Sequence, residues 1–154
     1  MIKLLEYNMK NVFDLADIEE VCFAKDAWTV NNLRGEFLNE FSYLIGYYQD
    51  DKLVGYTCVR AMYEEAQVCN VAVLPEYRRQ GIAKQLIEEM LRLSAEKGCQ
   101  ICELEVNTEN TPAVELYKKC GFEVAGIRKN FYRRTRYNSR DAYTMTKSLV
   151  EPQQ

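Results

Sequence analysis

The sequence predicts a single α/β domain, with a mixed, mostly antiparallel sheet of six to seven strands and helices on both faces. Three observations support this fold class. The 154 residues, 47% of them hydrophobic, fit one domain with a full core and are too few for two. Apolar patterns of period two and of period 3.6 alternate along the chain. No linker, repeat or low-complexity segment divides it. We therefore expect residues 1–150 to form one domain and residues 151–154 a short tail.

The first half of the chain predicts a strand, two helices and three more strands. A strand over 2–6 precedes a helix over 11–24, and Thr29 is the expected N-cap of the second helix. Strands follow at 42–49, 53–62 and 66–74, because the turn sequences QDDK and YEEA separate their apolar runs. The apolar positions that define the helices are Val12, Leu15, Ile18, Val21 and Cys22 in the first and Val30, Leu33, Phe37 and Leu38 in the second.

The second half predicts a long helix and then a strand, a short helix and two closing strands. The long helix covers 81–97 and stops at Gly98. Thr111 and Pro112 are the expected N-cap and first residue of the short helix, and Gly121 follows its end. The later elements are expected at 101–106, 112–119, 122–128 and 141–149. The buried side of the long helix is expected to contain Leu86, Ile87, Met90, Leu91 and Leu93.

Charge is unevenly distributed along the chain. The net charge of -3 argues against a general nucleic-acid binder. Residues 1–50 hold four Lys or Arg against nine Asp or Glu, whereas residues 118–147 hold nine against two. This asymmetry predicts one acidic and one basic surface, or two solvated faces that differ without consequence.

The sequence contains no signal-peptide pattern and no apolar run approaching 18 residues, so we expect a cytoplasmic protein without a membrane span. Six cysteines include one close pair, Cys99 and Cys102. A zinc site would need two more ligands, the chain has no histidine, and the other cysteines lie far apart in sequence. We therefore expect no metal site and interpret the cysteines as small buried hydrophobic residues.

The stretch PEYRRQGIA joins an apolar strand directly to the long helix. A helix start presents unpaired N–H groups and the positive end of the helix dipole, and Gly81 lets a ligand approach the main chain closely. Arg78 and Arg79 add positive charge, so a phosphorylated ligand is expected there. An ordinary turn with surface arginines is the alternative. The spacing matches neither a P-loop nor the dinucleotide-binding fingerprint.

The stretch CELEVNTENTPAVELYKKCGF contains candidate acid–base residues. If its strand alternates, Glu103 and Glu105 share one face. These two carboxylates either form the solvated face of the strand or include a general base. Tyr117 falls in the last turn of the short helix, as a packed aromatic or a proton donor. A carboxylate and a phenol can act as a general base and a general acid in one reaction.

The segment RRQGIA fits the pattern Q/R-x-x-G-x-G/A, and in it the sequence resembles the GNAT superfamily of N-acetyltransferases. This resemblance implies a GNAT fold and acetyl-CoA as cosubstrate. It implies that the strand before the loop exposes main-chain groups to the pantetheine arm, through Val71, Ala72 and Val73. It also implies a pyrophosphate cradle beside Arg78, made by Arg79, Gln80, Gly81, Ile82, Ala83 and Lys84.

Residues 70–132 are similar to the ribosomal-protein-alanine N-acetyltransferases of RimI type, through LEV at 104–106, Asn110, LY at 116–117, GF at 121–122 and RKNFY at 128–132. The resemblance implies that Glu105 is the general base, acting through water, that Tyr117 is the general acid, and that Asn110 contacts CoA. It also implies that the acceptor is the N-terminal alanine of a small-subunit ribosomal protein. Whether Glu103 shares the base role stays open.

The acceptor side resembles the family more loosely. CFAKDAWTVNNLRGEF is similar to the family segment with D-x-W-[ST] before the second helix, where acidic residues would receive a basic peptide. Arg133 and Arg140 stand where relatives have proline and glutamate, in a basic loop over 133–140. That loop could bind the 3′-phosphate of CoA, an acidic partner or ribosomal RNA, or be solvated. A relative acting on a small amine or lysine, or a non-catalytic acyl-CoA-binding module, are therefore the alternatives.

Overall fold

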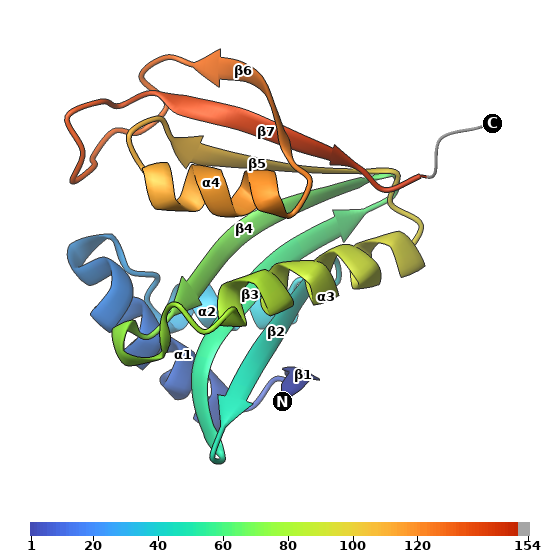
Figure 1. Ribbon diagram of the computed structural model, residues 1–154. Coiled ribbons are helices and arrows are strands. Elements are labelled where there is room, and N and C mark those ends of the chain that lie inside the picture. Colours follow the sequence, from blue (N-terminus) through green and yellow to red (C-terminus); the bar gives the residue numbers. More distant parts are fainter. Residues whose placement is uncertain (151–154) are drawn as a thin grey trace.

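A seven-stranded sheet runs through the computed structural model, which describes residues 1–150 (Figure 1). The expected tail at 151–154 lies outside the described residues. The strands are β1 (Ile2–Leu4), β2 (Ser42–Gln49), β3 (Lys52–Met62), β4 (Glu65–Val73), β5 (Ile101–Asn107), β6 (Glu123–Arg128) and β7 (Ala142–Ser148). The helices are α1 (Met9–Phe23), α2 (Val30–Leu38), α3 (Ile82–Glu96) and α4 (Thr111–Lys119).

The strand order is β1-β2-β3-β4-β5-β7-β6. Every neighbouring pair is antiparallel except β4 and β5, which are parallel. The predicted mixed, mostly antiparallel sheet is therefore confirmed. The last strand of the chain, β7, lies between β5 and β6, so the closing strands are not in sequence order.

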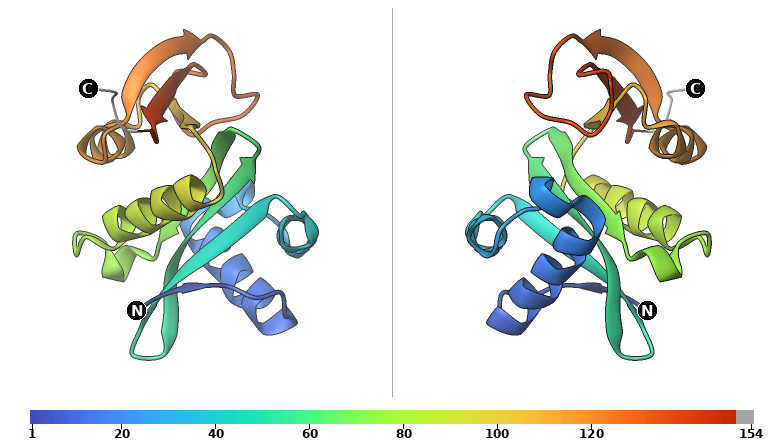
Figure 2. Two further views of the ribbon diagram at one scale, coloured as in Figure 1. Left: turned by 90° about the vertical axis from the view of Figure 1, so that its right-hand side faces the viewer. Right: turned by 90° about the vertical axis from the view of Figure 1, so that its left-hand side faces the viewer.

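Helices cover both faces of the sheet, as predicted. Figure 2 shows α3 and α4 on one side and α1 and α2 on the other. All five α3 positions predicted to be buried are buried, and each large aliphatic side chain removed from water contributes about 1.5–3 kcal/mol. No helix within residues 1–150 is long and apolar enough to span a bilayer.

The buried stripe of α1 differs from the prediction at two positions, Glu19 and Val21. Leu15, Ile18, Glu19 and Cys22 follow the i, i+3, i+4, i+7 spacing of one helix face, and all four are buried. Val21, which was expected on this stripe, is 58% exposed. The stripe passes through the neighbouring Cys22, so Val21 lies outside it.

The helix caps confirm one prediction and correct another. Thr29 caps α2 in a reciprocal capping box with Asn32. The N-cap of α4 is Asn110 and not Thr111, because Asn110 Oδ1 accepts a hydrogen bond of 3.4 Å from Ala113 N and Thr111 is already helical. Pro112 consequently lies one position further into the helix than predicted.

The predicted turn between β2 and β3 is a tight hairpin. Its two central residues, Asp50 and Asp51, have φ of 51° and 64°. Two successive residues with positive φ are typical of a type I′ turn, which matches the twist of paired strands, and Asp tolerates this conformation better than most residues. The turn therefore fixes the register with which β3 enters the sheet.

Candidate active site

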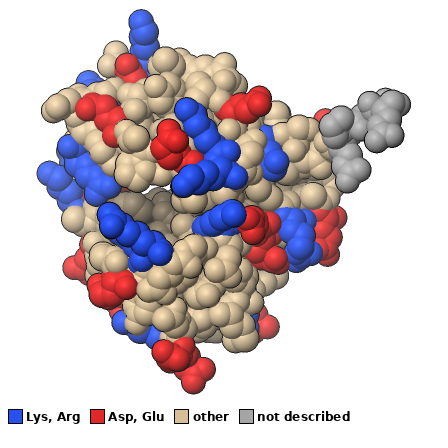
Figure 3. Space-filling model, in the orientation of Figure 1, with Lys and Arg blue, Asp and Glu red and all other residues tan. Residues whose placement is uncertain are grey.

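The parallel strands β4 and β5 pair at one end and then separate. Their register covers only 65–67 against 101–103. Beyond that point a cleft of about 460 Å³ opens between them, lined by 68–71 of β4, 104–107 of β5, the inner side of α4 and the loop after β6. Figure 3 shows a hollow in this face of the molecule with Lys and Arg side chains around it. Within the described residues, β4 has no strand partner on its cleft side beyond Gln67.

The side chains of β5 alternate as predicted. Cys102, Leu104 and Val106 are buried in the core, and Glu103 and Glu105 project from the other face. The Glu105 side chain is 12% exposed, against 35% for Glu103, so the two carboxylates have different surroundings. Only Glu105 lines the cleft.

Two neighbouring side chains hold the Glu105 carboxylate. Gln67 Nε2 donates a hydrogen bond of 2.8 Å to Glu105 Oε2. Arg128 Nη2 lies 3.7 Å from Glu105 Oε1 and 3.8 Å from Glu103 Oε1. Because Arg128 is half-exposed, this ion pair is weak, and the amide of Gln67 makes the shorter contact.

Tyr117 lines the opposite wall of the cleft from the last turn of α4. Its ring packs edge-on against Phe122, with the ring centroids 5.8 Å apart. Burial, together with nearby Tyr132, raises the pKa of Tyr117 above its ordinary value of 10.0. The phenol is therefore protonated at neutral pH and has a proton to give. Tyr117 is a packed aromatic that keeps its phenol proton, so its packing does not exclude the predicted role of proton donor.

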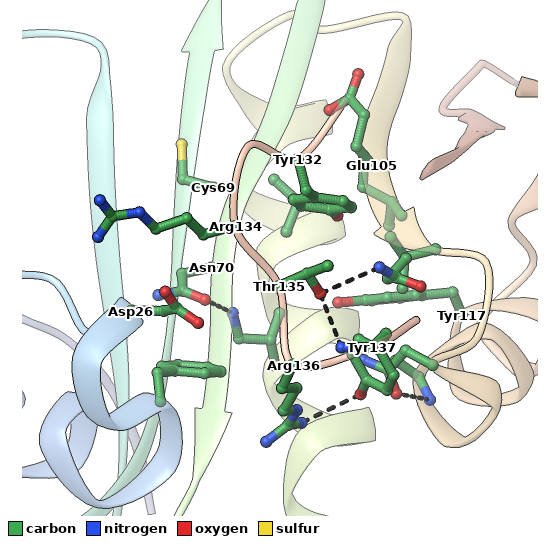
Figure 4. A pocket seen from close by; sticks show the side chains of 18 residues that line it. Asp26, Cys69, Asn70, Glu105, Tyr117, Tyr132, Arg134, Thr135, Arg136 and Tyr137 are labelled. Carbon is green, nitrogen blue, oxygen red and sulfur yellow. Dashed lines mark hydrogen bonds between the residues drawn. The ribbon is translucent and has the colours of Figure 1, made fainter. Parts of the chain in front are cut away.

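Tyr132, which follows β6, lies between the two walls. Figure 4 shows its ring between Glu105 and Tyr117. Burial and the charge of Glu105 raise the pKa of Tyr132 to about 12. Glu105 and Tyr117 share the cleft, but no hydrogen bond joins them within residues 1–150. Tyr132 belongs to the run RKNFY at 128–132, which resembles a family motif. From the sequence alone, Tyr132 itself had no assigned role.

The basic loop between β6 and β7 is attached to the end of β5. Asn107 Nδ2 donates hydrogen bonds to Ser139 O at 2.8 Å and to Thr135 Oγ1 at 3.3 Å. Arg140 Nε donates to Tyr132 O at 2.8 Å, so this arginine closes the loop upon itself. Arg134 and Arg136 line the cleft and make its rim positive.

The junction before α3 has the main-chain geometry that the sequence predicted. Arg79 and Gly81 have φ of 64° and 79°, and among the described residues no side chain caps the helix. An added Cβ on Gly81 would meet no atom within 4 Å, so the space beside it is open. Ile82 is buried in the core. The N–H groups of the first turn of α3 therefore stay available to an acceptor from outside residues 1–150.

The structure divides the predicted residues between two places along β4. Val71, Glu105, Asn110 and Tyr117 line the one cleft. The loop 78–84 follows the end of the same strand, after the short 3-10 helix Pro75–Tyr77, and Ala72 and Val73 lead to it. Arg78 turns back on the strand there, and its Nε donates a 2.9 Å hydrogen bond to Val73 O.

A buried carboxylate behind the cleft was missed by sequence reasoning. Glu19 is fully buried and accepts hydrogen bonds from Tyr56 Oη, from Asn70 Nδ2 and, at 3.2 Å, from Trp28 N. Burial raises the pKa of Glu19. Since Asn70 lines the cleft, this network ties α1 to the cleft wall. Glu19 lies four residues after Leu15, on the apolar stripe of α1, and this position was the signal in the sequence that it would be buried.

Two cysteines that lie apart in sequence come together in the fold. Cys58 and Cys69 meet across β3 and β4, and their Sγ atoms and a carboxylate oxygen of Glu36 all lie within 4.8 Å of one another. Antiparallel pairing brought them together, which the spacing alone did not reveal.

Comparison with known proteins gives one consistent result. Residues 10–122 match the model of the acetyltransferase (GNAT) family. A Bacillus subtilis protein with the provisional name ribosomal protein bS18-alanine N-acetyltransferase is 33% identical over 144 residues, covering 93% of each chain.

Solved structures agree with this match. The crystal structure of the ribosomal-protein-S18-alanine N-acetyltransferase from Escherichia coli superposes with a TM-score of 0.86 and 25% identity, covering 99% of this chain and 97% of that one. An aminoglycoside 6′-N-acetyltransferase complexed with coenzyme A has the same fold, with a TM-score of 0.84, 15% identity and coverage of 100% and 99%. The chain belongs to the acetyltransferase (GNAT) family.

Proposed function

We propose that this acetyltransferase moves the acetyl group of acetyl-CoA to the N-terminal α-amino group of a protein, namely the N-terminal alanine of a small-subunit ribosomal protein. The observation that carries the proposal is the placement of Glu105 and Tyr117 on opposite walls of one cleft, beside the free edge of β4. The names of the Bacillus subtilis and Escherichia coli relatives support the choice of acceptor. Residues 1–150 act as one catalytic domain, and a ribosomal acceptor implies action in the cytoplasm.

Acetyl-CoA would be held mainly by main-chain groups. The uncapped first turn of α3 offers N–H donors to the pyrophosphate, from Arg79 and Gln80 through Gly81, Ile82, Ala83 and Lys84. The open side of Gly81 leaves room for the phosphates. The unpaired edge of β4 at Val71–Val73 would hold the pantetheine arm, and Asn110, at the start of α4, would contact CoA where it enters the cleft.

The reaction needs two proton movements, and each wall supplies one. Glu105, through a water molecule, takes a proton from the acceptor ammonium, and the neutral amine then attacks the thioester carbonyl carbon. The tetrahedral intermediate collapses with cleavage of the C–S bond, and its nitrogen releases a second proton to solvent, which later reprotonates Tyr117. Tyr117 gives its proton to the departing thiolate, for which its raised pKa keeps it protonated. Each of these steps is worth on the order of 10²- to 10⁴-fold in rate.

The acid–base strength of the acceptor favours an α-amine. Its reference pKa is near 8, whereas that of lysine is about 10.4, so roughly a tenth of the former and well under a thousandth of the latter are neutral at pH 7. A carboxylate that acts through water suits the acceptor that is easier to deprotonate.

The test compares Glu105→Gln with Glu103→Gln and Tyr117→Phe. Turnover is measured with acetyl-CoA and peptides beginning with Ala, Ser or Met, a peptide with an internal lysine, and a polyamine. CoA affinity is measured by calorimetry. We expect Glu105→Gln and Tyr117→Phe to lose about 10²- to 10⁴-fold in turnover with CoA affinity kept. Glu103→Gln is the matched control, because Glu103 shares the strand face but not the cleft.

Three results would contradict parts of the proposal. Equal losses in the Glu103 and Glu105 variants would remove the assignment of the base. Acetylation of the polyamine or the lysine in preference to every α-amine would remove the assignment of the acceptor. Binding of CoA without turnover on any amine would support the acyl-CoA-binding module instead.

A further inference from the structure

Cys58 and Cys69 form a pair of thiols at an irregularity in the sheet. Cys58 pairs with Asn70 and Val59 pairs with Val68, so Cys69 is the extra residue of a β-bulge in β4. Their Sγ atoms lie within 4.8 Å of each other, and both are free thiols. A bulge turns a side chain out of its regular alternation, which here brings the Cys69 sulfur near that of Cys58.

The two thiols differ in their access to solvent. Cys58 is fully buried. Cys69 is half-buried and lines the cleft between Val68 and Asn70, as Figure 4 shows. A small reagent that enters the cleft therefore reaches Cys69 first and finds Cys58 directly behind it.

The surrounding groups favour a thiolate at Cys69 and a thiol at Cys58. Hydrogen bonding between the two thiols raises the pKa of Cys58 and lowers that of Cys69, and the Arg60 guanidinium lowers the latter further. Cys58 Sγ lies 3.8 Å from Glu36 Oε2, which further favours its protonated form. Cys69 Sγ lies 3.6 Å from Gln67 O, a contact that favours the thiol, so the net lowering of the Cys69 pKa comes from Cys58 and Arg60. Glu36 itself is paired with Arg60. This is the division between an attacking and a resolving cysteine.

We propose that Cys58 and Cys69 form a reversible disulfide when the protein meets a peroxide, and that this bond moves the part of β4 that lines the cleft. The Cys69 thiolate attacks one peroxide oxygen and the O–O bond breaks. Cys69 becomes a sulfenic acid, and the released hydroxide takes up one proton and departs as water. The Cys58 sulfur then attacks the sulfenic sulfur, and its proton leaves with the hydroxyl as a second water. Two thiols lose two electrons in all, and hydrogen peroxide gains them.

The bond would alter the cleft because Cys69 is part of its wall. Closing the disulfide draws the Cys69 sulfur toward β3 and moves the neighbouring Asn70, which is hydrogen-bonded to Glu19. This consequence for turnover depends on the proposed function, whereas formation of the bond does not.

The experiment maps the bond directly. The full chain is treated with hydrogen peroxide in the presence of a chelator, alkylated and digested with trypsin without reduction. Cleavage after Lys52, Arg60 and Arg78 places Cys58 and Cys69 on separate peptides, 53–60 and 61–78. We expect these two peptides to be joined, and to separate on treatment with dithiothreitol.

Two variants sharpen the result. In Cys58→Ser, where the hydroxyl can still donate to Glu36, Cys69 should stop at the sulfenic acid and be trapped by dimedone. In Cys120→Ser, which removes a half-buried thiol outside the cleft, the bond should form as in the unaltered protein. The proposal is overturned if Cys69 stays reduced at peroxide levels that oxidise Cys120, or if it pairs with another cysteine. The unaltered protein decides both points even if a variant fails to fold.

The effect on turnover is measured separately. Oxidised protein should acetylate an Ala-initial peptide at a rate lower by about tenfold or more, since small displacements at an acceptor site are costly, and dithiothreitol should restore it. A mapped disulfide with unchanged turnover overturns the reshaping of the cleft. Absence of turnover in the reduced protein would instead count against the proposed function.

Discussion

Gln67 on β4 donates a 2.8 Å hydrogen bond to Glu105 on β5 just where the two strands begin to separate. The residue that ends the paired part of the sheet thus orients the carboxylate that faces the cleft. The amide group of Gln67 is neutral, so it orients the Glu105 carboxylate by a hydrogen bond without neutralising its charge. Because this contact joins β4 and β5, it fixes the carboxylate relative to both strands.

The first prediction changes this contact. Gln67→Glu places a second carboxylate beside Glu105, and like charges disfavour ionisation of the two neighbouring groups. The acid limb of the kcat/KM profile should then move to higher pH, because the base is protonated over a wider range. The measurement is the pH dependence of acetylation, with Gln100→Glu as a charge-matched control outside the cleft. If the acid limb of the kcat/KM profile does not move, Gln67 does not influence the general base.

A second prediction concerns the alkaline side of the same profile. Burial raises the pKa of Tyr117 above 10.0, so its phenol stays protonated through the range in which the protein is assayed. We expect kcat to show no fall from loss of this proton between about pH 7 and pH 9.5. Tyr117→Phe should lower kcat across this whole interval by a constant factor. A loss confined to its alkaline end would contradict the role of general acid.

Replacement of Gly81 tests the turn before α3. Its φ of 79° is left-handed, so Gly81→Ala should cost about 1–2 kcal/mol of stability and weaken CoA binding by displacing the N–H groups. Gly35 is the matched control, since it lies inside α2 with open space around it, and Gly35→Ala should stabilise the protein by about 0.5–1 kcal/mol. Denaturant unfolding and calorimetry with CoA measure both. Equal behaviour of the two variants would show that the turn does not need glycine.

The ion pair between buried Glu36 and exposed Arg60 should make stability depend on pH. Burial alone would raise the pKa of Glu36, but hydrogen bonds from Arg60 and Ser42 outweigh it, and the net pKa falls below 4.5. The carboxylate therefore stabilises the fold above pH 4.5, and this contribution is lost as pH falls through the lowered pKa. Glu36→Gln should cost about 1–3 kcal/mol near neutral pH and less in acid. Chemical denaturation at several pH values, with the exposed Glu40→Gln as control, checks this.

Most of the fold was predictable because its signals are local. Every predicted helix and strand exists, and the boundaries differ by one or two residues, since period and capping are read from neighbouring positions. The cap of α4 was assigned one residue late because Asn110 and Thr111 are both good caps, and only the backbone distinguishes them. Insertion of β7 between β5 and β6 depends on pairing between distant segments, which no local pattern encodes.

The candidate site was predictable in parts. The alternation of β5 placed Glu105 correctly opposite the core residues, and the resemblance singled it out over Glu103. Tyr132 and Gln67 were missed because their positions depend on a loop and on a strand pairing. Glu19 was missed because acidic residues in a surface helix are usually solvated, whereas three donors from separate elements compensate its burial.

The separation of β4 from β5 also leaves a trace that amide hydrogen exchange can read. In an antiparallel strand successive N–H groups point to alternate edges, so past the bulge at Cys69 every second amide of β4 faces the cleft and lacks a strand acceptor within residues 1–150. Those amides should take up deuterium as quickly as a loop while their neighbours stay protected by β3. A bound molecule that pairs with this edge like an extra strand would slow deuterium uptake at the same alternate amides. The protected amides would then show where along β4 the molecule binds.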